Sequence, residues 1–98
     1  MKTRMFKIAV TLAVFLAAGP ASAACFADYK AKKENPLKLH YGVMRLDAAP
    51  CQMSKAISKT VKNRLAKGGW TLLQVRSVFD ERSLEAKKKD AGAYFLLF

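Results

Sequence analysis

The sequence predicts an α+β domain in the order β-α-β-(short α)-β: a three-stranded sheet, one long helix on one of its faces and a single disulfide. Three observations predict this fold. Apolar residues alternate over 37–46 and 70–79, as they do in strands. They recur about every fourth residue over 52–67, as they do in a helix. Two cysteines follow an N-terminal export signal, in a chain of only 98 residues.

The first 23 residues have the three parts of a secretory signal peptide. Three basic residues precede an apolar run over 8–18, and the small residues 21–23 suit a signal peptidase. We therefore expect cleavage between Ala23 and Ala24, a periplasmic or secreted protein, and no transmembrane segment in the mature chain. An uncleaved membrane anchor is the alternative, but the apolar run is shorter than the ~20 residues that a membrane span needs.

Both cysteines, Cys25 and Cys51, lie in the 75 residues that remain after cleavage. An oxidising compartment favours a disulfide between them, worth about 3–4 kcal/mol in the chain-entropy model. Free thiols are one alternative, and lipid modification of Cys25 is another. Lipoprotein signals carry a leucine-like residue three positions before the cysteine, where this chain has Ser22.

The mature chain begins with an expected N-terminal arm over 24–36, ahead of a small domain over 37–98. Within the arm, 26–34 is predicted to be a short helix or an ordered segment, and Asn35-Pro36 ends it. Residues 37–46 are predicted to form a strand. One face of that strand carries Leu37, Leu39, Tyr41 and Val43, and the other, wetter face carries Lys38, His40 and Gly42.

The strongest helix prediction covers 52–67. Its apolar stripe is Met53, Ile57, Val61 and Leu65, and Lys55, Lys59 and Lys62 lie on the opposite side. Gly68-Gly69 is a typical helix stop. Trp70 opens the second strand, 70–79, which a right-handed crossover makes parallel to the first.

A short exposed helix is predicted over 81–89, capped by Asp80 or Ser83 and ended by Gly92. The last residues, 93–98, are apolar on both faces, which indicates a central strand. We expect this strand to lie between the other two, antiparallel to both. The alternative makes 81–89 a crossover helix and places the last strand parallel to 70–79.

The segment Leu65-Ala66-Lys67-Gly68-Gly69-Trp70-Thr71-Leu72-Leu73 resembles small bacterial domains of unknown function, in which a helix ends in Leu-x-x-x-Gly-Trp-x-Leu. Gly69, Trp70 and Leu72 match that signature. The wider chain resembles a small exported bacterial family of unknown function. The segments that carry this resemblance are Cys25-Phe26-Ala27-Asp28-Tyr29-Lys30, Asn35-Pro36-Leu37, Leu39-His40-Tyr41-Gly42 and Tyr94-Phe95-Leu96. The resemblance implies a fold and an envelope location but no activity.

No pattern of catalytic, cofactor-binding or metal-ligating residues emerges from the sequence. His40 is the only histidine, and we interpret it as a solvent-facing strand residue; pairing with Asp28, Asp47 or Asp80 would be needed for acid–base chemistry. One histidine and two distant cysteines do not make a zinc site. Trp70, Tyr94, Phe95 and Phe98 are expected in the core. We therefore predict a non-enzymatic protein without cofactors or metals.

Charge is the remaining signal. The signal peptide holds three of the 18 basic residues and none of the 7 acidic ones, so the mature chain carries +8. Such a field attracts anions, and we predict that Lys55, Lys59 and Lys62 bind an anionic lipid, a glycan or an acidic protein of the envelope. Lysine clusters at 30–33 and 87–89 are further candidates. Export argues against nucleic acid as the natural partner. The alternatives are a structural or self-associating protein whose charge serves solubility, and a small hydrolase or inhibitor that uses His40.

Overall fold

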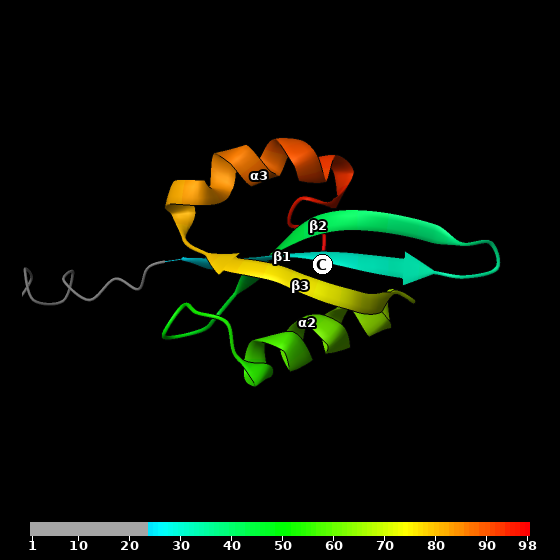
Figure 1. Cartoon of the computed structure of the whole chain (residues 1–98), viewed down its shortest axis with the longest axis horizontal. Coiled ribbons are helices and arrows are strands. Elements are labelled where there is room, and N and C mark those ends of the chain that lie inside the picture. The colour runs from blue at the N-terminus through cyan, green and yellow to red at the C-terminus, as the bar shows by residue number, and fades with distance from the viewer. Residues whose placement is uncertain (1–23) are drawn as a thin grey trace, which may run out of the picture.

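The computed structural model describes residues 24–98, which form a three-stranded antiparallel sheet with a helix on each face (Figure 1). The strands are β1 (Cys25–Lys33), β2 (Lys38–Leu46) and β3 (Thr71–Phe79). The helices are α2 (Lys55–Lys67) and α3 (Leu84–Ala91), with short 3-10 helices at η2 (Glu81–Ser83) and η3 (Gly92–Tyr94). The predicted α+β class is confirmed. The predicted signal peptide, up to Ala23, lies outside the described residues.

The strand at the centre of the sheet is β1, not the end of the chain. The order is β2-β1-β3, and β1 pairs antiparallel with both neighbours. Residues 26–34, expected as a short helix or an ordered arm, are therefore a strand. Asn35-Pro36 does end the segment as predicted, but it does so in the tight turn to β2. Because β2 and β3 both run against β1, they are parallel to each other, as the predicted crossover requires.

The C-terminal residues 93–98 do not form the predicted central strand. After α3 and η3 the chain lies along the outer edge of β2, where Val43 and Phe95 form a single parallel bridge. The backbone N–H of Leu96 donates to the carbonyl of Val43 at 2.8 Å. Both expected placements of a last strand are therefore wrong, because β1 already occupies the position between β2 and β3.

The helix predicted over 52–67 is confirmed as α2, with Ser54 as its N-cap. The Ser54 hydroxyl accepts a hydrogen bond from the backbone N–H of Ile57 at 3.2 Å, which satisfies a free donor of the first turn. At the other end, the N–H of Gly69, at φ 82°, donates to the carbonyl of Ala66. Ile57, Val61 and Leu65 are buried as the apolar stripe predicts, whereas Met53 precedes the helix and is exposed.

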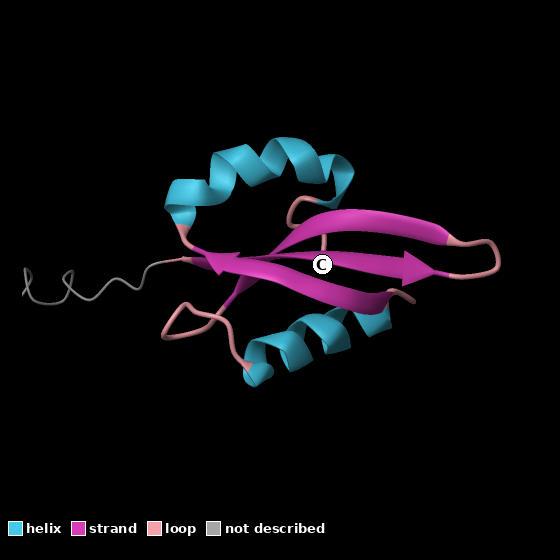
Figure 2. Ribbon diagram, in the orientation of Figure 1, coloured by secondary structure: helices cyan, strands magenta, loops and turns pink. Residues whose placement is uncertain are grey.

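The expectation of one long helix is wrong, because a second helical segment covers the other face of the sheet (Figure 2). α2 has 13 residues, and α3 adds a further helix of 8. Ala91 of α3 is buried against Phe26 and Val43, and Leu84 packs on the same cluster. The opposite core, between the sheet and α2, contains the fully buried Tyr29, Met44, Val61 and Leu65.

The prediction for the two faces of β2 holds only in part. Val43 is buried, Tyr41 is half-buried and Lys38 is exposed, as predicted. His40 and Gly42, however, are buried on the α2 side, while Leu37, in the turn, and Leu39 are 64% and 66% exposed. The phenol ring of Tyr29 lies directly against the Gly42 backbone, where any β-carbon would collide with it. Glycine at 42 therefore makes room for the largest fully buried side chain and does not indicate a solvent-facing surface.

Candidate anion-binding site

The three predicted anion-binding lysines share the outer face of α2. Lys55, Lys59 and Lys62 are all exposed. They lie at positions i, i+4 and i+7, so their ammonium groups form a strip about 10 Å long at 1.5 Å per residue. α2 contains five basic residues and no acidic one: Lys55, Lys59, Lys62, Arg64 and Lys67. Of these, Arg64 bends back to the sheet and donates to the carbonyl of Arg45 at 2.7 Å.

The basic residues in the first half of α2 oppose its stability, whereas Arg64 and Lys67 stand in the last turn, where the helix dipole favours positive charge. Lys55 stands in the first turn, where the helix dipole favours acidic side chains, and no acidic residue is present there. Lys55 and Lys59 form an i,i+4 pair of like charge, and Lys59 and Lys62 form an i,i+3 pair, which repel each other. An anion bound across this strip would remove that repulsion.

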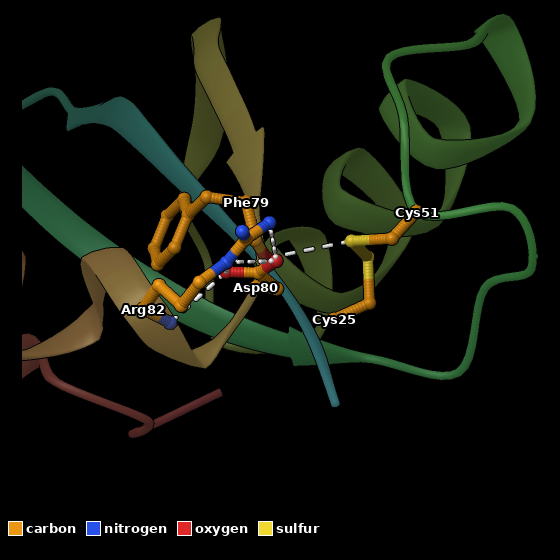
Figure 3. The surroundings of a disulfide bond; sticks show 5 residues. All are labelled: Cys25, Cys51, Phe79, Asp80 and Arg82. Carbon is orange, nitrogen blue, oxygen red and sulfur yellow. Dashed lines mark hydrogen bonds and ion pairs between the residues drawn. A yellow bond between two sulfur atoms is a disulfide. The ribbon is translucent and has the colours of Figure 1, made fainter. Parts of the chain in front are cut away.

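The disulfide between Cys25 and Cys51 is confirmed, with their Cα atoms 5.5 Å apart (Figure 3). It joins the start of β1 to the loop that leads into α2. The sulfur of Cys51 also lies 3.4 Å from the carbonyl oxygen of Phe79, at the end of β3. The bond therefore fixes two segments at one end of the domain, the start of β1 and the loop before the lysine-bearing helix, and it packs against the end of β3.

The other face of the sheet carries a buried carboxylate, Asp28, at the middle of β1. It accepts hydrogen bonds from the hydroxyls of Tyr41 and Ser77 and from the ammonium of Lys87 at 3.2 Å. Burial alone would raise the pKa of Asp28, but the hydrogen bonds that it accepts outweigh this and hold the pKa below its usual value. The low pKa favours the ionised carboxylate of Asp28, and groups of the protein itself already donate hydrogen bonds to both of its oxygens.

An open groove of 880 Å³ lies between this face and α3, with Asp28 at its base. Lys30 and Arg76 line it and have exposed side chains, whereas Lys87 is engaged by Asp28 and Arg82 by Asp80. Asp90 contributes an opposing charge at the rim. The groove is thus of mixed charge, in contrast to the uniformly basic face of α2.

His40 is buried and not solvent-facing, which corrects the prediction. Its ring stacks on Tyr94 with centroids 3.8 Å apart and meets Trp70 edge-on at 4.3 Å. Its Nε2 lies 3.0 Å from the hydroxyl of Tyr29. Burial lowers the pKa of His40, and the charge of Lys33 lowers it further, so both favour the neutral ring.

The aspartates that were considered as partners of His40 lie elsewhere. Asp28 points to the opposite face of the sheet, toward α3. Asp80 caps η2 by accepting from the backbone N–H of Arg82 at 2.9 Å, as predicted for that residue, while Ser83 makes no side-chain cap. Within residues 24–98 the structure brings together no group of three metal-ligating side chains.

Sequence reasoning missed two features of this molecule. The first is the Asp28–Lys87 pair, for which an acidic residue between apolar positions of a strand was the available signal. The second is the exposure of Leu37 and Leu39, which alternation had assigned to a core face. The expected packing of the aromatics holds: Trp70 is buried, and Tyr94, Phe95 and Phe98 pack against the two cores.

Comparisons of the chain with protein-family models, with curated proteins and with solved structures found no match. The resemblance to a small exported bacterial family therefore stays a prediction.

Proposed function

We propose that this protein is an exported, non-enzymatic binding module whose helix α2 engages a polyanionic component of the cell envelope. The observation that carries the proposal is the strip formed by Lys55, Lys59 and Lys62, on a helix of five basic residues and no acidic one. Solubility alone would be served by charges of both signs, which stabilise a helix when they are paired. This helix instead concentrates one sign at a cost to its own stability.

The ligand is defined by closely spaced anionic groups, such as the phosphates of a lipid headgroup or the acidic groups of a glycan. Lysine ammonium groups act as point charges, which bind such groups without a fixed geometry. The structural alternative, self-association through a sheet edge, has less support. The outer edge of β2 is partly covered by the bridge to Phe95, and β3 is interrupted by two register shifts, a feature that disfavours edge-to-edge pairing.

The test compares binding of the oxidised protein to three probes at low salt: polyphosphate, vesicles containing phosphatidylglycerol, and polyglutamate. We expect the triple variant Lys55→Gln/Lys59→Gln/Lys62→Gln to bind the preferred probe at least ten times more weakly, because each lysine near an anionic surface contributes about 1 kcal/mol. The matched control is Arg45→Gln/Lys88→Gln/Lys89→Gln, which removes the same net charge from exposed positions outside α2 and outside the hairpin between β1 and β2.

Equal losses in the two triple variants would mean that net charge alone matters and that α2 is not a site. Absence of binding to all three probes at low salt would reject the proposal altogether. Preference for polyglutamate over the phosphate probes would reassign the partner to an acidic protein.

A further inference from the structure

The hairpin between β1 and β2 carries exposed leucines that the fold does not use. It extends beyond both helices, at the end of the sheet opposite the disulfide (Figure 1). Leu37, in its turn, and Leu39, at the start of β2, are 64% and 66% exposed. Leu73, on the neighbouring part of β3, is 50% exposed. Three large aliphatic side chains at one end of a small domain mark a surface that meets an apolar partner.

Leu39 and two lysines share the sheet face that α3 covers elsewhere, with Leu73 beside them and Leu37 in the adjoining turn. Lys30 and Lys32 lie two and four residues beyond Asp28 in β1. Their side chains therefore project to the same side of the sheet as Lys87, the residue of α3 that pairs with Asp28. Lys32 stands opposite Leu39 in the strand register. Lys30, Leu39 and Leu73 line one small hollow of 200 Å³. We call Lys30, Lys32, Leu37, Leu39 and Leu73 the hairpin patch.

The positive charge around the hairpin patch indicates which kind of apolar partner it contacts. The segment 30–41 contains four lysines and one glutamate, Glu34, which pairs with Lys32 at 3.3 Å. A second copy of the chain would bring lysines against lysines. An acidic lipid surface instead accepts the leucines between its headgroups and pairs with the ammonium groups, since lysine stems lie along apolar surface with the charge at the interface.

We propose that the hairpin patch docks the protein on the surface of an anionic lipid bilayer, with Leu37, Leu39 and Leu73 inserted to headgroup depth. This contact is separate from the lysine strip, because α2 covers the other face of the sheet (Figure 2). The proposal does not rest on the function assigned to α2. If both are correct, the protein holds a lipid surface at the end of its sheet and a polyanion on its helix.

The experiment measures co-sedimentation of the oxidised protein with vesicles of phosphatidylcholine, with and without phosphatidylglycerol. We expect binding to the anionic vesicles, part of which survives added salt. Leu39→Ser/Leu73→Ser should lower the partition coefficient at least tenfold, because two apolar side chains no longer leave water. The matched control Leu97→Ser changes a leucine that is 58% exposed in the C-terminal tail, and it should stay within about twofold of the unsubstituted protein.

Polyphosphate binding separates this proposal from the one for α2. It should be unchanged in Leu39→Ser/Leu73→Ser, and circular dichroism checks that the double variant is folded. Failure of the polyphosphate test with retained, leucine-dependent vesicle binding would remove only the α2 proposal. The hairpin proposal is overturned if the double variant binds vesicles as well as the unsubstituted protein does. It is also overturned if Leu97→Ser loses as much binding, or if neutral vesicles bind equally well.

Discussion

At the scale of single residues, Asp28 is the side chain that links the most elements. Its carboxylate accepts from Tyr41 in β2, Ser77 in β3 and Lys87 in α3, while its own backbone belongs to β1. Breaking a buried ion pair by removing one partner leaves the other charge uncompensated and costs about 3–5 kcal/mol, less where that partner reaches solvent. The Lys87 side chain is 29% exposed, so the lower end of this range applies.

We expect Asp28→Asn to lower the free energy of unfolding by about 3 kcal/mol at neutral pH, measured by chemical denaturation. Asp47→Asn is the control, because Asp47 is an exposed carboxylate in the loop after β2, and its change should stay within about 0.5 kcal/mol. Similar values for the two variants would show that the Asp28 network contributes nothing beyond an ordinary surface charge.

The same residue predicts the direction of the acid response. The folded-state pKa of Asp28 lies below the unfolded value, so its ionised form stabilises the fold above that unfolded value, about 3.9. This contribution is lost as the pH falls through the folded-state pKa. The unsubstituted protein should therefore lose stability below about pH 4, and Asp28→Asn should lose less over the same interval.

The residues that sequence reasoning misplaced are those whose surroundings come from a distant segment of the chain. His40 and Gly42 look like solvent-facing positions, because neither is a large aliphatic residue. Gly42 is buried because the ring of Tyr29 occupies the space beside it, and His40 because Trp70 and Tyr94 surround its ring. No local pattern in the sequence reveals such contacts.

At the scale of elements, prediction succeeded where local signals were strong. Apolar periodicity and the glycine stop predicted α2, although it begins at Lys55 and not at residue 52, and β3 follows directly from it. The identity of the central strand depends instead on which segments pair over long distances. β1 alternates the small residues Ala27 and Ala31 with polar ones, so its hydrophobic signal is weak, yet all nine of its residues pair with β2. Residues 93–98 do not occupy the central position in the sheet, although they are more hydrophobic than β1.

The tail nevertheless contributes to the fold through its aromatic rings. Tyr94 covers His40 from one side, and Phe98 lies 5.9 Å from the same ring, centroid to centroid. We expect Tyr94→Ala/Phe98→Ala to lower the free energy of unfolding by about 3 kcal/mol, as partly buried aromatics are removed. The emission of Trp70, the only tryptophan, should shift to the red, because Tyr94 also packs against it.

Leu97→Ser is the control for this prediction, since it changes an exposed side chain of the same tail. If the double alanine variant kept both its stability and its tryptophan emission, the tail would be a loosely held end and not part of the core.

At the scale of the whole molecule, the described residues 24–98 are divided between two small cores. The α2 side is the larger, and the α3 side holds only three buried apolar residues, so neither face alone stabilises the sheet by much. The two cores meet only through the strands. Cys25 is almost completely buried in the larger core, and its bond to Cys51 fixes the end of the sheet where β1 begins and β3 finishes.

We therefore expect Cys25→Ala/Cys51→Ala to lower the free energy of unfolding by about 3–4 kcal/mol, as the chain-entropy model gives for a loop of this length. Small domains are stable by about 5 kcal/mol, so the variant should retain only about 1–2 kcal/mol, which leaves roughly 3–15% of the molecules unfolded at 25 °C. Denaturant titration of the variant and of the unsubstituted protein, oxidised and reduced, measures the effect. The reduced protein should match the variant, because both lack the same constraint. A variant within about 1 kcal/mol of the oxidised protein would mean that the two cores suffice without the disulfide.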